Sequence, residues 1–237
     1  MSQSPVFELA ADRVAGALRA RIAAGDLAPA TPLRDAALAQ SFRVSRNTVR
    51  EAFRMLRHDG LVEHQLNRGV VVRSLGVDDV HDIYRVRHVV EVRAIQESVL
   101  APSVAMDAVG EAVTRAEAAV ADRAFADVGT ASLAFHQALV GLLGSPTLNG
   151  FFDTVVARLR LAFAVMEDEA AFQEPWVPRD RRIWQLLLAG DRRRAEDGLR
   201  RYLDDSHRNV VDVVRAHAST ATAASTRPVD RREHSSR

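Results

Sequence analysis

Residues 44–64, VSRNTVREAFRMLRHDGLVEH, contain an amphipathic helix with local signals at both ends. Ser45 belongs to the residue types that cap helix N-termini through a side-chain oxygen, and Asp59-Gly60 ends the apolar repeat. These signals predict a helix over residues 46–58. At about 100° per residue, an apolar face adjoins an arginine face. The apolar face is formed by Val49, Ala52, Phe53 and Leu56, and the arginine face by Arg46, Arg50, Arg54 and Arg57.

The segments around this helix predict a small domain of mixed structure over residues 1–74. Residues 34–42 form a short second helix, and residues 61–66 and 70–73 read as strands around the tip Asn67-Arg68-Gly69. A first helix within residues 7–27 has an apolar face. That face is formed by Leu9, Val14, Ala17, Leu18 and Ile22. Three helices followed by a hairpin is the order of a winged helix-turn-helix.

Charge separates this segment from the rest of the chain. Residues 1–74 carry 11 arginines against 7 acidic residues, whereas residues 75–217 carry 17 against 22. An arginine stripe is often only a solvated face. Here it begins at a helix N-terminus, includes Asn47 beside the arginines, and is followed by Arg68 at a hairpin tip. Arg and Asn are the residue types that make bidentate contacts to guanine and adenine, so we interpret the surface as a DNA contact.

The remainder of the chain reads as helices separated by Pro, Gly or polar breaks, without a convincing period-two strand. We therefore predict a mainly α protein. Its parts are a winged helix-turn-helix over residues 1–74, a linker over 75–80, an all-helical bundle over 81–217, and a disordered tail over 218–237. The tail is small, polar and unpatterned.

Several classes of protein do not fit the composition. The chain has no cysteine, which excludes disulfides and thiolate zinc sites. No apolar run reaches the roughly 20 residues of a membrane helix, and the N-terminal residues lack the pattern of a secretory signal. We expect a cytoplasmic protein without a membrane partner.

The segment PLRDAALAQSFRVSRNTVREAFRMLRHDGLVEHQLNRGVVV resembles the DNA-binding domain of the GntR family of bacterial transcription regulators. The pieces L-x-(D/E)-x-x-L-A, V-S-R-N-T-V-R-E-A, L-x-x-x-G-L-V and N-R-G-x-x-V occur in order over some 40 residues. The resemblance implies that double-stranded operator DNA is a partner. The recognition-helix contacts it implies are Arg46, Asn47, Thr48 and Arg50, and the wing contacts are Arg68 and Gly69.

The helical part, with IYRVRHVVE, FHQAL, SPTL and LLLAGD, resembles the effector-binding (FCD-like) domain of the FadR-type branch of that family. Many members of the branch hold a metal through an Asp, the His of FH and two later histidines. Here those positions are Ser132, His136, Asp180 and Tyr202, which is a poor ligand set. We therefore expect no metal and no cofactor.

The resemblance places the same four residues in the wall of an effector pocket, together with Arg87, whose guanidinium suits a ligand carboxylate. For Arg87, an ion pair with Glu91 at i+4 remains an alternative. For His136, the alternative is a core histidine hydrogen-bonded to a neighbour.

The leading hypothesis is a homodimeric transcriptional regulator, a repressor, which binds a palindromic operator and responds to a small-molecule effector. One alternative is a helical enzyme or metal-binding protein with a basic N-terminal module. The sequence contains no Ser/His/Asp constellation, phosphate loop or paired-carboxylate motif that requires a reaction, so we expect no enzymatic activity. Another alternative is a DNA-binding dimer that senses nothing.

Overall fold

The computed structural model describes residues 9–166 and 168–225. Its N-terminal unit contains three helices and a two-stranded antiparallel sheet, which confirms the predicted winged helix-turn-helix order. The strands pair from Val62 opposite Val72 to Gln65 opposite Gly69. The elements are α1 (Ala10–Ala23), α2 (Asp35–Phe42), α3 (Arg46–His58), β1 (Val62–Gln65) and β2 (Gly69–Val72).

Local chemistry accounts for the ends of these elements. Helix α3 spans the predicted residues, and the backbone N–H of Thr48 donates to Oγ of Ser45 at 3.1 Å. Arg43 ends α2 in the left-handed conformation, with φ of 54°. The hairpin reverses through Asn67 and Gly69, whose φ angles are 64° and 73°. Asn and Gly tolerate positive φ better than other residues, so this tip suits a tight turn.

The apolar face of α1 differs from the prediction at two positions. Val14, Leu18 and Ile22 are buried as expected, but Ala15 is buried where Ala17 was predicted. Leu9 is 68% exposed because it precedes the first helical residue and lies outside the packed turns.

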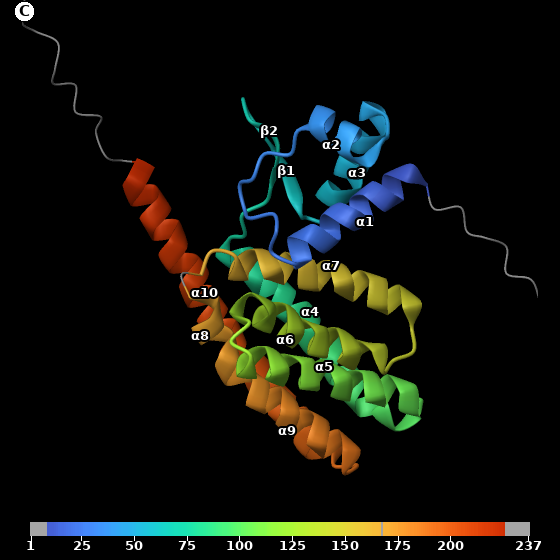
Figure 1. Ribbon diagram of the computed structural model, residues 1–237. Coiled ribbons are helices and arrows are strands. Elements are labelled where there is room, and N and C mark those ends of the chain that lie inside the picture. The colour runs from blue at the N-terminus through green and yellow to red at the C-terminus, as the bar shows by residue number, and fades with distance from the viewer. Residues whose placement is uncertain (1–8, 167, 226–237) are drawn as a thin grey trace, which may run out of the picture.

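The regular elements in the described residues of the body are all helices, as predicted (Figure 1). No helix in the described part of the chain is long and apolar enough to cross a membrane. The helices are α4 (Val77–Glu97), η1 (Ser98–Leu100), α5 (Ser103–Ala121), α6 (Phe125–Gly141), α7 (Pro146–Phe163), α8 (Glu169–Gln173), η2 (Glu174–Trp176), α9 (Val177–Leu188) and α10 (Arg192–Ser225).

Helices extend into two segments that were predicted to be a linker and a disordered tail. The linker predicted over residues 75–80 is shorter, because α4 already begins at Val77, where Asp79 accepts a hydrogen bond from the backbone N–H of Gly76 at 3.0 Å. The tail predicted from residue 218 is helical as far as Ser225, since α10 continues through its small residues. The rest of that predicted tail, residues 226–237, lies outside the described residues.

The N-terminal unit rests on α7 of the body, and α6, α5 and α9 follow beneath (Figure 1). Each part has its own apolar core, but Ala157 and Leu161 of α7 belong to the core of the N-terminal unit. Asp79 adds ion pairs at the junction, with its Oδ1 2.7 Å from Arg73 Nη2 and 3.6 Å from Arg158 Nη2. The two parts are therefore joined by shared packing as well as by the linker.

Candidate nucleic-acid interface and buried polar site

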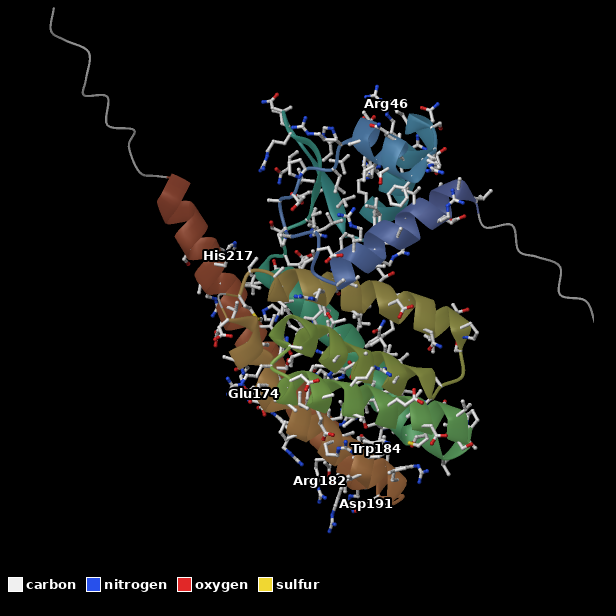
Figure 2. The ribbon with its side chains drawn as sticks, viewed as in Figure 1. Arg46, Glu174, Arg182, Trp184, Asp191 and His217 are labelled. Carbon is white, nitrogen blue, oxygen red and sulfur yellow. The ribbon has the colours of Figure 1, made fainter. Side chains whose placement is uncertain are left out.

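Helix α3 separates its apolar and arginine faces as its sequence predicts. Val49, Ala52 and Leu56 are fully buried against the unit's core, whereas the side chains of Arg46 and Arg50 are 60% and 59% exposed. Figure 2 shows Arg46 on the N-terminal unit, at the opposite end of the molecule from the labelled Trp184 and Asp191 of the body. The two arginines are thus free to meet a partner that approaches this unit.

The other predicted contacts of α3 lie in its first turn. Asn47 is exposed, and Thr48 is half-buried, with its hydroxyl 2.9 Å from Oγ of Ser45. Asn47 therefore projects beside Arg46, while Thr48 also takes part in the helix cap.

A groove of about 600 Å³ runs between α2, the start of α3 and the wing. Its charged and polar lining comes from Arg34, Asp35, Arg46, Arg50, His64 and Arg68. Arg68 donates to Oε1 of Gln65 at 3.3 Å and to the carbonyl of Ala30 at 3.4 Å. The groove brings Arg46 and Arg50 of α3 to one surface with Arg68 and Gly69 of the wing, whereas the predicted contacts Asn47 and Thr48 are not among its lining residues.

Asp35 is a member of this surface that the sequence did not reveal. Its Oδ1 lies 3.4 Å from Arg46 Nη2, and its Oδ2 accepts a hydrogen bond from Arg50 Nε at 3.2 Å. From sequence, this residue is explained by its favourable position in the first turn of a helix. Its second role depends on the crossing of α2 and α3, which no local pattern encodes.

The body holds a second group of polar residues in its interior. Arg87 Nε donates to Oε1 of Glu91 at 2.7 Å, and His136 Nδ1 lies 2.6 Å from Oε2 of the same carboxylate. All three side chains are buried. The i+4 ion pair of Arg87 is therefore present, but inside the helical bundle, and His136 has a hydrogen-bonded neighbour.

The other predicted pocket residues lie beside this triad. Ser132 Oγ donates to Oδ2 of Asp180 at 3.4 Å, and the Tyr202 ring centroid is 5.0 Å from that of His136. Ser132 and His136 come from α6, Asp180 from α9 and Tyr202 from α10. The fold thus gathers the sequence-predicted residues into one buried polar site, whose members are Arg87, Glu91, Ser132, His136, Asp180 and Tyr202. Glu91 was expected only as a partner of Arg87; its contact with His136 was missed.

Burial and the Arg87–Glu91 ion pair together set the pKa values in this site. Burial raises the pKa of Asp180 well above its usual value, and hydrogen bonding from Ser132 offsets only part of this effect. Burial lowers the pKa of His136, which the Glu91 carboxylate only partly counters. The pKa of Glu91 falls below its usual value, because Arg87 and His136 together outweigh the opposing effect of burial. A charged Arg87–Glu91 pair therefore lies beside a neutral imidazole and a carboxyl group that favours its proton.

Two polar atoms of the site lack a hydrogen-bond partner among the described residues, namely Arg87 Nη2 and Asp180 Oδ1. A buried polar atom without a partner is costly unless a water or a bound molecule supplies one, and Tyr202 also hydrogen-bonds the Asp180 carboxyl group.

The site does not fit a transition-metal ion. His136 directs Nδ1 at Glu91, Glu91 is shared with Arg87, and Ser132 and Tyr202 are weak ligands. Within residues 9–166 and 168–225, no three His, Cys, Asp or Glu side chains form a group able to hold a metal.

Family models match both parts of the chain. Residues 10–72 match the model described as bacterial regulatory proteins, gntR family, and residues 82–205 match the FCD domain. A GntR transcriptional regulator from Rhodococcus sp. RHA1 is similar in structure, with a TM-score of 0.78 and 35% identity over 85% of this chain and 97% of that one. McbR/YncC of E. coli shares the fold at 17% identity and a TM-score of 0.73, over 86% of this chain and 98% of that one.

Two regulators are related over a shorter segment. The chain is 37% identical over 79 residues to the HTH-type transcriptional regulator YdhC of Bacillus subtilis, which is 33% of this chain and 35% of YdhC. It is 39% identical over 83 residues to BphR of Paraburkholderia xenovorans, also an HTH-type transcriptional regulator, over 35% of this chain and 34% of BphR. The match thus spans about a third of each relative.

Proposed function

Because this chain belongs to the gntR family of bacterial regulatory proteins and carries an FCD domain, we propose that it is a cytoplasmic, homodimeric repressor that binds a palindromic operator and responds to a small-molecule effector. The family is one of DNA-binding transcriptional regulators rather than enzymes. The observation that carries the proposal is the groove in which Arg46 and Arg50 of α3 face the wing residue Arg68.

The groove supports binding to duplex DNA in a defined orientation. The first turn of α3 would enter the major groove, where arginine donates to guanine and Asn47 can pair with adenine. Arg68 would contact the adjacent backbone or minor groove from the hairpin tip. Contacts of α3 would then specify sequence, and contacts of the wing would fix orientation.

A palindromic operator requires two copies of the chain. Recognition helices in successive major grooves lie about 34 Å apart, which one N-terminal unit cannot span. The helical body would supply the two-fold contact. Sedimentation should therefore find a dimer at micromolar concentration, and a monomer that binds a single half-site one-to-one would contradict this part of the proposal.

The buried polar site is proposed to hold the effector. Arg87 Nη2 calls for an acceptor, such as a carboxylate or carbonyl oxygen, and Asp180 Oδ1 suits a hydroxyl or amine. A plain dicarboxylate suits the site less well, because Arg87 already pairs with the Glu91 carboxylate. The site residues are at most 2% exposed, so ligand entry requires the surrounding helices to move.

Helix α4 offers a route from the effector to the DNA-binding unit. It carries Arg87 and Glu91 in the site, and Asp79 near its N-terminus pairs with Arg73 just after β2. An effector that favours one position of α4 would bias the orientation of the N-terminal unit. It regulates only if it binds the DNA-competent and DNA-incompetent forms with different affinity.

The proposal is tested by selecting bound duplexes from a random pool and then screening metabolites for release of the enriched duplex. We expect a palindromic consensus and a releasing compound. The double variant Arg87→Met/Glu91→Leu should keep operator affinity but lose release. Enrichment of no common sequence would contradict the DNA-binding role, and release that is unchanged in the variant would contradict the effector site.

A further inference from the structure

One carboxylate in the groove holds two arginines of α3. Asp35, the first residue of α2, reaches Arg46 Nη2 with one oxygen and Arg50 Nε with the other. Arg46 and Arg50 lie one helical turn apart. The Asp35 side chain is 26% exposed, whereas both arginine side chains are about 60% exposed. The carboxylate thus lies beneath two guanidinium groups that face outward.

The contact with Asp35 leaves the two terminal nitrogens of Arg50 available to a base. Asp35 engages Nε, so the two terminal nitrogens of Arg50 remain for the O6 and N7 atoms of guanine. An unsupported arginine samples many rotamers and loses that freedom when it binds a base. The carboxylate also offsets the repulsion between two cations at i and i+4.

We propose that Asp35 is a specificity-determining positioning residue, which holds Arg50, and Arg46 beside it, in the conformation that reads guanine. This inference rests on the proposed DNA-binding function. Asp35 should strengthen binding to the specific operator and weaken binding to non-specific DNA. It favours the specific complex through the arginines, and its negative charge disfavours non-specific binding to phosphates.

The chain offers a matched control in Glu51. This residue pairs with Arg54 on the same helix, and it does not contact Arg46 or Arg50 in the described ion pairs. Glu51→Gln removes the same charge as Asp35→Asn from the same N-terminal unit, outside the residues that line the groove. It should change operator and random-sequence affinity by the same factor, which leaves their ratio unaltered.

The test measures affinity for two duplexes, the one enriched by the wild type and a scrambled duplex of equal length. We expect Asp35→Asn to lower the ratio of the two affinities about tenfold or more, with scrambled-duplex affinity unchanged or raised. Selection with this variant should lose guanine at the contacted positions. Asp35→Glu should recover part of the ratio. Asp35→Asn should lower the ratio less in an Arg50→Ala background than in the wild type, and no further when both Arg46 and Arg50 are replaced by Ala.

Thermal unfolding and scrambled-duplex binding verify that each variant is folded. If Asp35→Asn melts early, Asp35→Ala, which has a high helix propensity and likewise lacks the carboxylate, replaces it. Wild-type guanine preference in the Asp35 variants, or an equal loss of ratio in Glu51→Gln, would overturn the inference. A wild type that enriches no sequence would overturn the DNA-binding function and the inference together, so the two failures are distinguishable.

Discussion

His136 Nδ1 lies 2.6 Å from Oε2 of Glu91, and the two residues are 45 positions apart in the chain. This contact joins α6 to α4 in the interior of the body. Since Glu91 also pairs with Arg87, one carboxylate supplies the counter-charge of the buried guanidinium and a hydrogen-bond partner for the buried imidazole.

Removal of the Glu91 carboxylate should therefore be costly. We expect Glu91→Ala to lower the free energy of unfolding by about 3–5 kcal/mol, because it leaves Arg87 buried without its counter-charge. The double variant Arg87→Met/Glu91→Leu removes both charges and should lose less. Urea unfolding measures both values. A Glu91→Ala protein as stable as the wild type would show that the pair does not support the fold.

The His136 site should weaken the fold in acid. Its pKa in the folded chain lies below the usual value of 6.5, chiefly because of burial. Below about pH 6.5 the unfolded chain therefore binds a proton at His136 that the folded chain does not yet bind. The free energy of unfolding falls as the pH drops through this range. The pKa of Glu91 is also low, so its contribution is lost at still lower pH. His136→Gln should flatten the first part of this decline in melting curves recorded from pH 8 to pH 5. An unchanged profile would contradict the assignment.

Asp180 should have the opposite pH dependence. Its folded pKa is raised, so its contribution is complete below the usual value of 3.8 and is lost as the pH rises through the folded pKa. Asp180→Asn keeps the shape of the side chain but has no acidic proton. Its free energy of unfolding, relative to that of the wild type, should therefore be higher at pH 8 than at pH 4. Urea midpoints at the two pH values test this, with the exposed Asp107→Asn as a control. A variant whose stability relative to the wild type is lower at pH 8 than at pH 4 would contradict this prediction.

The two outward arginines of α3 should each contribute to operator binding. We expect Arg46→Ala or Arg50→Ala to weaken binding by about 1–3 kcal/mol if each makes a bidentate base contact. Arg68→Ala should weaken binding with less dependence on sequence. Titration with the selected duplex measures the losses. Unchanged affinity in both α3 variants, with folded protein, would exclude this surface.

The absence of a metal remains a prediction that purified protein can test. We expect less than one equivalent of transition metal per chain, and a melting temperature unaffected by chelator. A stoichiometric ion bound through His136 would contradict both the expectation and the role given to Glu91.

The sequence alone predicted the winged helix-turn-helix and the bounds of α3. The signals that set the bounds of α3 are local, since Ser45 caps its own helix and Asp59-Gly60 ends it. The family resemblance also named most of the buried site. The apolar pattern misplaced Leu9, and it did not show that α4 begins within the predicted linker or that α10 continues to Ser225. The apolar period does not show which turn packs or where a helix of small and polar residues ends.

Only the tertiary structure decided which partners the charged groups have. Asp35 meets Arg50 because α2 crosses α3, and Glu91 meets His136 because α4 packs on α6. The core of the N-terminal unit likewise takes Leu161 from α7, far along the chain. Periodicity and capping reflect interactions within about one helical turn, whereas these pairings follow from how whole helices pack against one another.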